Sequence, residues 1–304
     1  EEIERAGQEI AKEEMKEANS DGTPIEDIAI DSHYFKNASC LNQKVVLDDK
    51  SSLQHLYSKN LEPLQNGIRT LAKDLKRMFR SDRGNKTHHT SGRINLYRYS
   101  SGRVSTRIFD KRRAPGEIDD LAVFILVDES GSMWGDKEIA ARQSCIALAE
   151  TFDILDIPLY IMGFTADDNG YDANHMHYVN WSNTVANRLK LLNITARRNN
   201  FDGYSIRYAG EILKKKNAKH KLLVVLSDGQ PACFKYSDVS AIPDTKDAIK
   251  GVKEFASVLG VAIGNNDTEQ IRSLYEKDFL HISNVNELFI GVAKQIQKII
   301  KSWK

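Results

Sequence analysis

The sequence predicts an α/β protein whose core is a doubly wound, mostly parallel sheet with helices on both faces. From about residue 120 to the end, strand-like and helix-like segments alternate, an order that builds a parallel sheet covered by crossover helices. Residues 121–127 form an unbroken apolar run, as expected for a strand buried on both faces. Residues 222–226 form a second run of this kind. We therefore place these two strands inside the sheet.

Residues 1–50 precede this sheet and give little sign of a core of their own. The first part is acidic and helix-prone, and residues 19–24 (Asn-Ser-Asp-Gly-Thr-Pro) interrupt it. We expect an acidic segment that is partly disordered or helical.

Residues 51–118 are expected to form a helical extension followed by a basic β-hairpin. Apolar residues recur at helical spacing from Leu53 to Phe79, which indicates amphipathic helices that pack on the following domain or on a partner. Pro63 should start or kink a helix there.

Two short segments between these helices and the sheet alternate apolar and polar residues. They are residues 92–99 and 104–109, with a Ser-Ser-Gly turn between them, and this pattern predicts a β-hairpin. Residues 81–92, just before them, are polar and rich in turn formers, so we expect a solvated loop there.

Residues 119–304 form the main domain in this interpretation. The expected strands are residues 122–127, 158–163, 176–179, 222–226, 257–263 and 279–282, and the expected helices are residues 136–153, 184–193, 204–215, 245–255, 267–276 and 285–301.

Composition limits the class of protein. The 304 residues are 41% hydrophobic and 28% charged, as in ordinary globular proteins. The chain has no apolar run near the roughly 18 to 20 residues that a membrane span needs, and residues 1–16 are acidic, unlike a signal peptide. We therefore expect a cytoplasmic protein. Its three cysteines show no paired spacing, which argues against a disulfide framework or a cysteine metal site.

The net charge of +1 hides an uneven distribution along the chain. Residues 1–29 carry ten acidic against three basic residues, whereas residues 68–114 carry fourteen basic against three acidic ones. The basic block indicates an electrostatic contact. Nucleic acid is one candidate partner, but an acidic protein partner or segment fits better, because aromatic residues do not interleave with the charges as in RNA-binding motifs.

A cluster of oxygen side chains follows the first apolar strand. Asp128, Ser130 and Ser132 occupy alternate positions in the loop before a helix, so all three can face one point at the carboxyl end of the strand, where ligands of such sheets bind. Oxygen donors without His or Cys suit Mg²⁺, Mn²⁺ or Ca²⁺. Glu129 is expected to face away from the ion, and Trp134 is either an exposed interface anchor or a core residue.

Two further loops can contribute to the same site. The second apolar strand ends at Asp228, which would lie near Asp128 if the two strands are neighbours. Before the helix of residues 204–215 lie Asn200 and Asp202. Three loops at one sheet edge could therefore supply the oxygen ligands of one divalent ion.

The motif from Asp128 to Ser132 resembles the metal-ion-dependent adhesion site of von Willebrand factor A domains, and residues 227–229 (Ser-Asp-Gly) resemble their third motif. The resemblance covers about residues 120–304. It implies that the acid and both serines of the first motif, a residue of the second loop and Asp228 surround an ion, whose shell a partner's acidic group often completes.

The second loop departs from the family pattern, because Asn200 stands where a ligating Thr is expected and Asp202 follows two residues later. Whether Asn200 or Asp202 binds the ion directly stays open. Together with residues 92–94 and 207–209, the loop resembles a bacterial branch that includes the T subunit of aerobic cobaltochelatase and the nitric-oxide-reductase activation proteins. The resemblance implies an accessory protein that works with a MoxR-type AAA+ ATPase.

The departure has an electrostatic consequence. Asp128, Asp202 and Asp228 around a divalent cation would leave a formal charge of about minus one, which weakens the capture of an incoming carboxylate. Our hypothesis is that Asp202 lies behind the direct ligands or binds through water, so that one position stays open for a partner's acid.

The sequence thus predicts a metal-dependent, noncatalytic protein-interaction module. A noncatalytic subunit of a chelatase-like complex is one form that such a module can take. One alternative is a Mg²⁺-dependent phosphohydrolase with Asp128 as nucleophile, but such enzymes need a second Asp where Ser130 stands. Another is nucleic-acid binding through residues 68–114, which should be lost on adding salt.

Overall fold

The computed structural model describes residues 28, 30, 39–44, 50–81, 85–89, 93–94, 96–100, 109–112, 121–167, 172–228, 233, 236, 238–264, 269–282 and 285–302. Most of the predicted acidic segment and the second half of the predicted hairpin lie outside these ranges.

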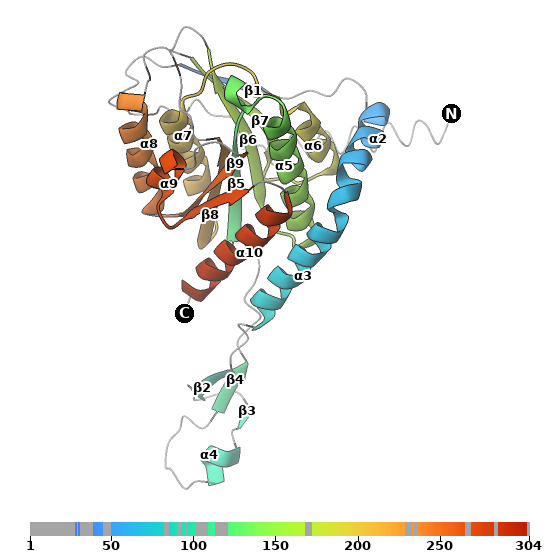
Figure 1. Cartoon of the computed structure of the whole chain (residues 1–304). Coiled ribbons are helices and arrows are strands. Elements are labelled where there is room, and N and C mark those ends of the chain that lie inside the picture. Colours follow the sequence, from blue (N-terminus) through green and yellow to red (C-terminus); the bar gives the residue numbers. More distant parts are fainter. Residues whose placement is uncertain are drawn as a thin grey trace.

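Within the described residues, seven strands form the main sheet in the order β1-β7-β6-β5-β8-β9-β10 (Figure 1). They are β1 (Ser39–Lys44), β5 (Leu121–Asp128), β6 (Leu159–Ala166), β7 (Asp172–Asn180), β8 (His220–Ser227), β9 (Ser257–Ile263) and β10 (Phe279–Ile282). Neighbouring strands run parallel, except that β7 is antiparallel to β6. The doubly wound, mostly parallel sheet is therefore confirmed.

Helices cover both faces of this sheet. They are α2 (Lys50–Leu61), α3 (Gln65–Ser81), α5 (Asp136–Ile154), α6 (Val185–Leu189), α7 (Asp202–Lys215), α8 (Asp238–Lys253), α9 (Glu269–Tyr275) and α10 (Val285–Ser302). In Figure 1, α3, α5, α6 and α10 lie on one side, and α7, α8 and α9 on the other. The helices predicted from the sequence are all present, although α8 begins seven residues before its predicted start.

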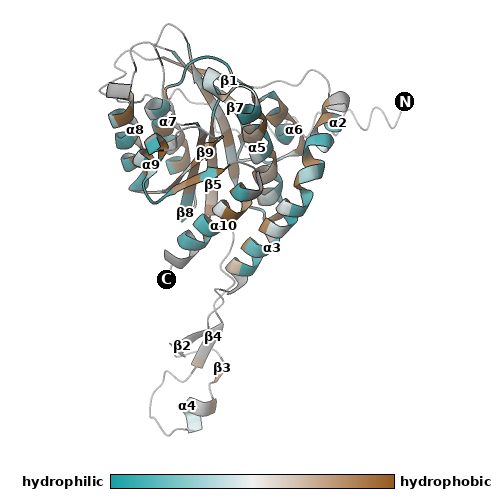
Figure 2. Ribbon diagram, viewed as in Figure 1, coloured by the Kyte–Doolittle hydropathy of each residue, from teal (hydrophilic) through white to brown (hydrophobic). Residues whose placement is uncertain are grey.

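The central strand β5 is apolar from Leu121 to Val127 because both of its faces are buried. Val123, Ile125 and Val127 belong to the hydrophobic cluster that includes α5 and α10, whereas Phe124 and Leu126 belong to the cluster on the α7 and α8 face. Each of these five side chains is fully buried, and burying a side chain of this size stabilises the fold by about 1.5 to 3 kcal/mol. Figure 2 shows the brown strands between helices whose outer surfaces are teal.

The predicted amphipathic helices of residues 53–80 are confirmed as α2 and α3. Pro63 lies in the short 3-10 helix Glu62–Leu64 that joins them, where a missing backbone N–H is tolerated. Ile68, Leu71 and Leu75 of α3 are buried in the cluster that includes α5 and α10. These two helices therefore share the hydrophobic core of the sheet domain.

The prediction of a β-hairpin from residues 92–99 and 104–109 is wrong in detail. A small three-stranded sheet has the order β2-β4-β3, with β2 (Asn85–His89) inside the predicted loop, a two-residue β3 (Arg93–Ile94) and β4 (Phe109–Arg112). Only the antiparallel pairing of the two predicted segments is kept, through Ile94 and Phe109.

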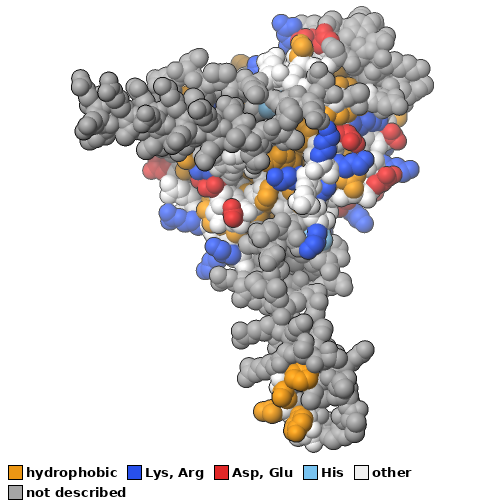
Figure 3. Space-filling model, turned by 180° about the vertical axis from the view of Figure 1, so that it is seen from behind, with side chains coloured by type: hydrophobic (Ala, Val, Ile, Leu, Met, Phe, Trp, Pro, Cys, Tyr) orange, Lys and Arg blue, Asp and Glu red, His pale blue; other side chains and the backbone are white. Residues whose placement is uncertain are grey.

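A helix, α4 (Leu96–Ser100), occupies the rest of the first predicted strand. Leu96 and Tyr99 are 75% and 67% exposed, so no core face selects the alternating pattern, and alternation predicts a strand only where one face is buried. Figure 3 shows apolar side chains gathered on this projecting part of the molecule.

The edge strand β1 was not anticipated. It pairs in parallel with β7, with Cys40 beside Ala173 and Asn42 beside His175. Two buried histidines of β7 fasten it, because His175 contacts the Cys40 sulfur at 3.1 Å and His177 contacts the Asn42 side-chain oxygen at 3.0 Å. In the part of the chain that the structure describes, no helix combines the length and apolar character needed to cross a membrane.

Candidate metal centre

The two predicted site strands are neighbours in the sheet. β5 and β8 pair in parallel, with Val127 opposite Leu226, so Asp128 and Asp228 emerge at the same edge. Both residues are 2% exposed. The sequence prediction that these two acids lie close together is confirmed.

Asp128 is held by three hydrogen bonds from three different segments. Its Oδ1 accepts from the Ser130 backbone N–H at 2.8 Å, and its Oδ2 accepts from Ser227 Oγ at 2.7 Å and Asn200 Nδ2 at 3.3 Å. Burial, and next the Asp228 carboxylate, raise the pKa of Asp128 to about 6. A divalent cation beside Asp128 would oppose both effects by favouring the ionised form.

The two serines connect the first and third loops. Ser130 Oγ lies 3.0 Å from Ser132 Oγ, and Ser132 Oγ donates to Asp228 Oδ1 at 3.1 Å. Ser130 is buried whereas Ser132 is exposed, so the row of oxygens reaches from the interior to the surface.

The second loop brings Asn200 and Asp202 to the same edge. Asn200 is fully buried and donates to Asp128 as described, which places its amide group beside the first motif. Asp202 is the first residue of α7 and is 5% exposed. Its Oδ2 makes no hydrogen bond within the described residues, and an unpartnered buried carboxylate oxygen is unfavourable without a cation.

Asp202 interacts electrostatically with the other two acids. Burial, then the charge of Asp128, and further the charge of Asp228 raise the pKa of Asp202 well above its usual value of 3.8. The structure therefore brings all six predicted residues to one edge.

Glu129 faces away from this edge, as expected, into a polar network that the sequence did not reveal. Its Oε1 accepts from the Tyr178 hydroxyl at 2.6 Å and its Oε2 from Arg197 Nε at 2.8 Å. Burial outweighs these two contacts and raises the pKa of Glu129 to about 7. Gly163 makes room, because a Cβ atom there would lie 1.8 Å from Glu129 Oε1.

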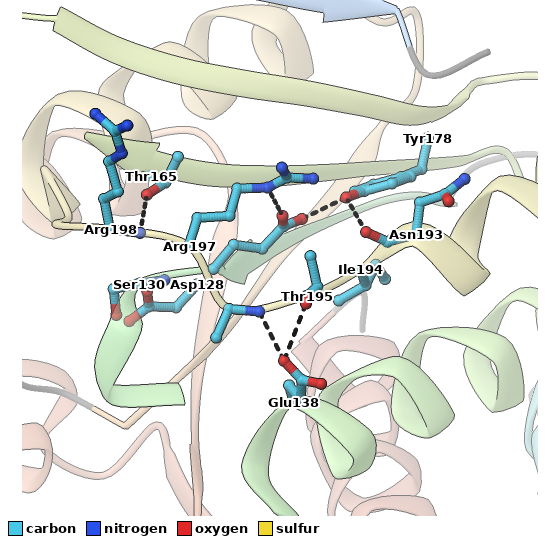
Figure 4. A network of polar contacts seen from close by, with 12 residues as sticks. Asp128, Ser130, Glu138, Thr165, Tyr178, Asn193, Ile194, Thr195, Arg197 and Arg198 are labelled. Atoms are coloured by element: carbon cyan, nitrogen blue, oxygen red, sulfur yellow. Dashed lines mark hydrogen bonds and ion pairs between the residues drawn. The ribbon is translucent and has the colours of Figure 1, made fainter. Parts of the chain in front are cut away.

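The same network fastens the segment that carries Asn200 (Figure 4). The Arg197 backbone N–H donates to the Glu129 carbonyl at 2.7 Å, and the Gly131 N–H donates to the Arg198 carbonyl. Glu138 of α5 accepts from Thr195 Oγ1 at 3.1 Å and from the Ala196 N–H at 2.8 Å. The first and second loops are therefore held together as a unit.

A lysine that the sequence reading did not single out also reaches the site. Lys137 Nζ lies 2.7 Å from Asp228 Oδ2 and 3.0 Å from the Ser132 carbonyl oxygen. Helical spacing alone does not show that a side chain in the first turn of α5 reaches the end of β8.

The donors at this edge fit a hard cation. They are carboxylate, hydroxyl and amide oxygens, which suit Mg²⁺, Mn²⁺ or Ca²⁺. Among the described residues, no group of three or more His, Cys, Asp and Glu side chains is placed to hold a metal. The Ser130 and Ser132 hydroxyls are the further oxygen donors at this edge.

This doubly wound sheet, with an oxygen-rich edge where β5 and β8 end, defines the class of von Willebrand factor A domains. A family model described as the VWA domain of the cobalamin biosynthesis protein CobT matches residues 109–302. The chain therefore belongs to this family.

One relative is the uncharacterized protein YojO of Bacillus subtilis (strain 168). The chain is 28% identical to it in an alignment of 219 positions that covers 67% of this chain and 34% of that protein. It thus spans about a third of that relative's length.

Solved structures with a similar arrangement include the conserved hypothetical protein BatB from Bacteroides thetaiotaomicron, with a TM-score of 0.46, 16% identity, and coverage of 60% of this chain and 99% of that one. A von Willebrand factor type A structure from Catenulispora acidiphila has a TM-score of 0.42, 15% identity, and coverage of 63% and 44%.

Proposed function

We propose that this chain is a metal-dependent, noncatalytic protein-interaction module. Its ion is Mg²⁺, with Mn²⁺ or Ca²⁺ as substitutes, and it is held at the edge described above. The residues that surround it are Asp128, Ser130, Ser132, Asn200, Asp202 and Asp228. The bound ion supplies a positive charge that an acidic side chain of the partner can bind.

The spacing of three oxygens carries this proposal. Mg²⁺ binds oxygen at about 2.0 to 2.1 Å in octahedral geometry, so adjacent ligand oxygens lie about 3 Å apart. The Ser130 and Ser132 hydroxyls are 3.0 Å apart, and Ser132 Oγ is 3.1 Å from Asp228 Oδ1. This row of oxygens already has the separation that such an ion requires.

The noncatalytic role follows from the chemistry of the loops. A phosphohydrolase with Asp128 as nucleophile needs a second acid two residues later. Ser130 occupies that position and contacts Ser132. We therefore assign the site to binding.

The family suggests the setting in which this module works. Its description names cobalamin biosynthesis. Together with the resemblance given in the sequence analysis, this leads us to propose an accessory subunit that couples a MoxR-type AAA+ ATPase to a client metalloenzyme or to a metal-insertion complex. The partner would reach the ion from the side of the exposed Ser132.

Pull-down of partners by the purified chain tests the proposal. Wild type in Mg²⁺ should recover a partner that is lost in EDTA and lost with Asp128→Ala in either condition. Asp74→Ala, which removes a carboxylate that pairs with Arg77 on α3, is the matched control and should behave as wild type. Equal recovery of the same partner in all conditions would refute metal-dependent docking. Recovery that survives EDTA but disappears with added salt would favour the basic block of residues 68–114.

A further inference from the structure

The Lys137 side chain contacts Asp228, one of the proposed metal ligands. Its ammonium group lies 2.7 Å from Asp228 Oδ2, and Ser132 Oγ donates a hydrogen bond to Asp228 Oδ1 at 3.1 Å. Both oxygens of this carboxylate are therefore engaged within the chain. A divalent ion that takes Asp228 as a direct ligand would share this carboxylate with the Lys137 ammonium, a second cation 2.7 Å from Oδ2.

The backbone provides space for the lysine stem. Gly264, directly after β9, has a φ of +98°, and a Cβ atom there would lie 3.2 Å from both Cγ and Cε of Lys137. A side chain at this position would press on the stem and would be strained as well. The Lys137 side chain is 18% exposed and that of Asp228 is fully buried, so the ammonium covers the carboxylate from the solvent side.

We infer that the Lys137 ammonium is a built-in counter-ion that competes with the divalent cation for Asp228. In the metal-free chain it neutralises the charge of Asp228. When the ion binds, two cations on one carboxylate repel each other, and the flexible lysine stem swings toward solvent. This inference rests on the proposed function, because it concerns the same site.

The exchange changes the charge that a partner meets. Three ionised acids and one divalent ion give a formal charge of about minus one, and the lysine brings the total to about zero. The displaced ammonium stays near the mouth of the site, close to Ser132, because its stem is anchored in the first turn of α5. The partner class is therefore one with an acidic side chain, which the lysine and the ion can receive together.

Mn²⁺ titration of Lys137→Met tests the competition, with binding followed by electron paramagnetic resonance. The substitution keeps an apolar stem of similar length and removes the ammonium. We expect Mn²⁺ to bind about tenfold more tightly than to wild type, because no ammonium has to be displaced from a partly buried carboxylate. In EDTA the variant should unfold at a lower temperature, since Asp228 has lost its cation, and Mg²⁺ should raise its unfolding temperature by more than it does in wild type.

Two controls separate this effect from a change in net charge. Lys59→Met removes a charge from an exposed position of α2 and should leave Mn²⁺ affinity unchanged. Lys137→Arg keeps the positive charge and should keep the affinity near that of wild type. If Lys137→Met does not fold, Lys137→Gln serves the same purpose.

The outcomes distinguish this inference from the proposed function. Unchanged or weaker Mn²⁺ binding by Lys137→Met, with clear binding by wild type, overturns the competition and leaves the metal site in place. If Mn²⁺ binds to Lys137→Met but not to wild type, the ammonium excludes the ion completely, which supports the competition. No binding by either chain overturns both proposals.

Discussion

Arg197 Nε lies 2.8 Å from Glu129 Oε2 and links the segment before Asn200 to the loop of the first motif. Glu129 is fully buried at its carboxylate, whereas the Arg197 side chain is 37% exposed. The pair is therefore only partly desolvated. It connects two loops whose side chains are brought together at Asp128.

Replacing Arg197 by Met should loosen this connection. It leaves the buried Glu129 carboxylate with a hydrogen bond from the Tyr178 hydroxyl but without its cation. We expect a loss of about 1 to 2 kcal/mol in the free energy of unfolding, less than for a fully buried pair because Arg197 is partly exposed. Urea unfolding in EDTA measures the change. The double variant Glu129→Gln with Arg197→Met should be more stable than Arg197→Met alone. If the two single losses simply add, the pair is not coupled.

The two histidines of β7 predict how stability depends on pH. Burial, and next the charge of His177, hold the pKa of His175 well below its usual value of 6.5. As the pH falls through that usual value, unfolded His175 takes up a proton and folded His175 does not. The contribution of His175 to the free energy of unfolding should therefore fall as the pH drops from about 7 to about 5. Glu129 and Asp128 contribute with the opposite sign there, because their raised pKa values let the folded chain take up protons first.

The variant His175→Gln isolates this contribution. Its slope of free energy of unfolding against pH should differ from that of wild type in that range by up to about 1.4 kcal/mol per pH unit, the most that one proton can give, because the unfolded variant takes up no proton at this position. Denaturant unfolding at several pH values measures both chains. His55→Gln, at an exposed position of α2, should keep the wild-type slope. A His175→Gln slope equal to that of wild type would contradict the assignment.

The sequence predicted the central sheet and both site strands because a strand buried on both faces needs apolar residues at every position. Residues 121–127 of β5 and 222–226 of β8 satisfy this requirement. The acids at their ends could therefore be placed before their spatial relation was known. The order of the site loops follows from the same reasoning.

Contacts between distant segments were less accessible to sequence reasoning. β1 is an edge strand whose partner β7 lies more than a hundred residues away, and its short polar sequence has no apolar pattern. Lys137 and Arg197 act through long side chains whose direction depends on the final packing. The small sheet was misjudged because the alternation in residues 96–99 faces no core.

Asp202 decides how many charges surround the ion. Our hypothesis places it behind the direct ligands, so Asp202→Asn should weaken Mn²⁺ binding about tenfold, the lower end for a group that acts through a ligand or a water. Asp128→Asn removes a direct ligand and should abolish binding under the same conditions. Calorimetric titration compares the two variants.

A crystal soaked in Mn²⁺ gives the direct answer about Asp202. The anomalous signal should lie against Asp128 and the two serines, with Asp202 not bound to the ion and one coordination position open to a partner. Direct coordination by Asp202 with no open position would sink the hypothesis.

The exposed side chain of Trp134 is the expected contact of the partner beside the proposed metal site. It is 80% exposed, whereas the adjacent Met133 is 1% exposed, so of the two alternatives for Trp134 the exposed position is confirmed. Large aromatic side chains contribute strongly to interfaces. Trp134→Ala should weaken binding of the Mg²⁺-dependent partner about tenfold or more. It should leave Mn²⁺ affinity unchanged, because Trp134 is not one of the residues proposed to bind the ion.

Ile139→Ala provides the comparison for this variant. Ile139 is 44% exposed on α5, and its loss removes an exposed apolar side chain one turn further along the helix. If Ile139→Ala weakens partner binding as much as Trp134→Ala, the contact is a broad apolar surface along α5. If only Trp134→Ala weakens it, the indole is an anchor beside the ion, and the partner must present an apolar pocket next to its acidic side chain. If neither variant changes partner binding, Trp134 lies outside the interface.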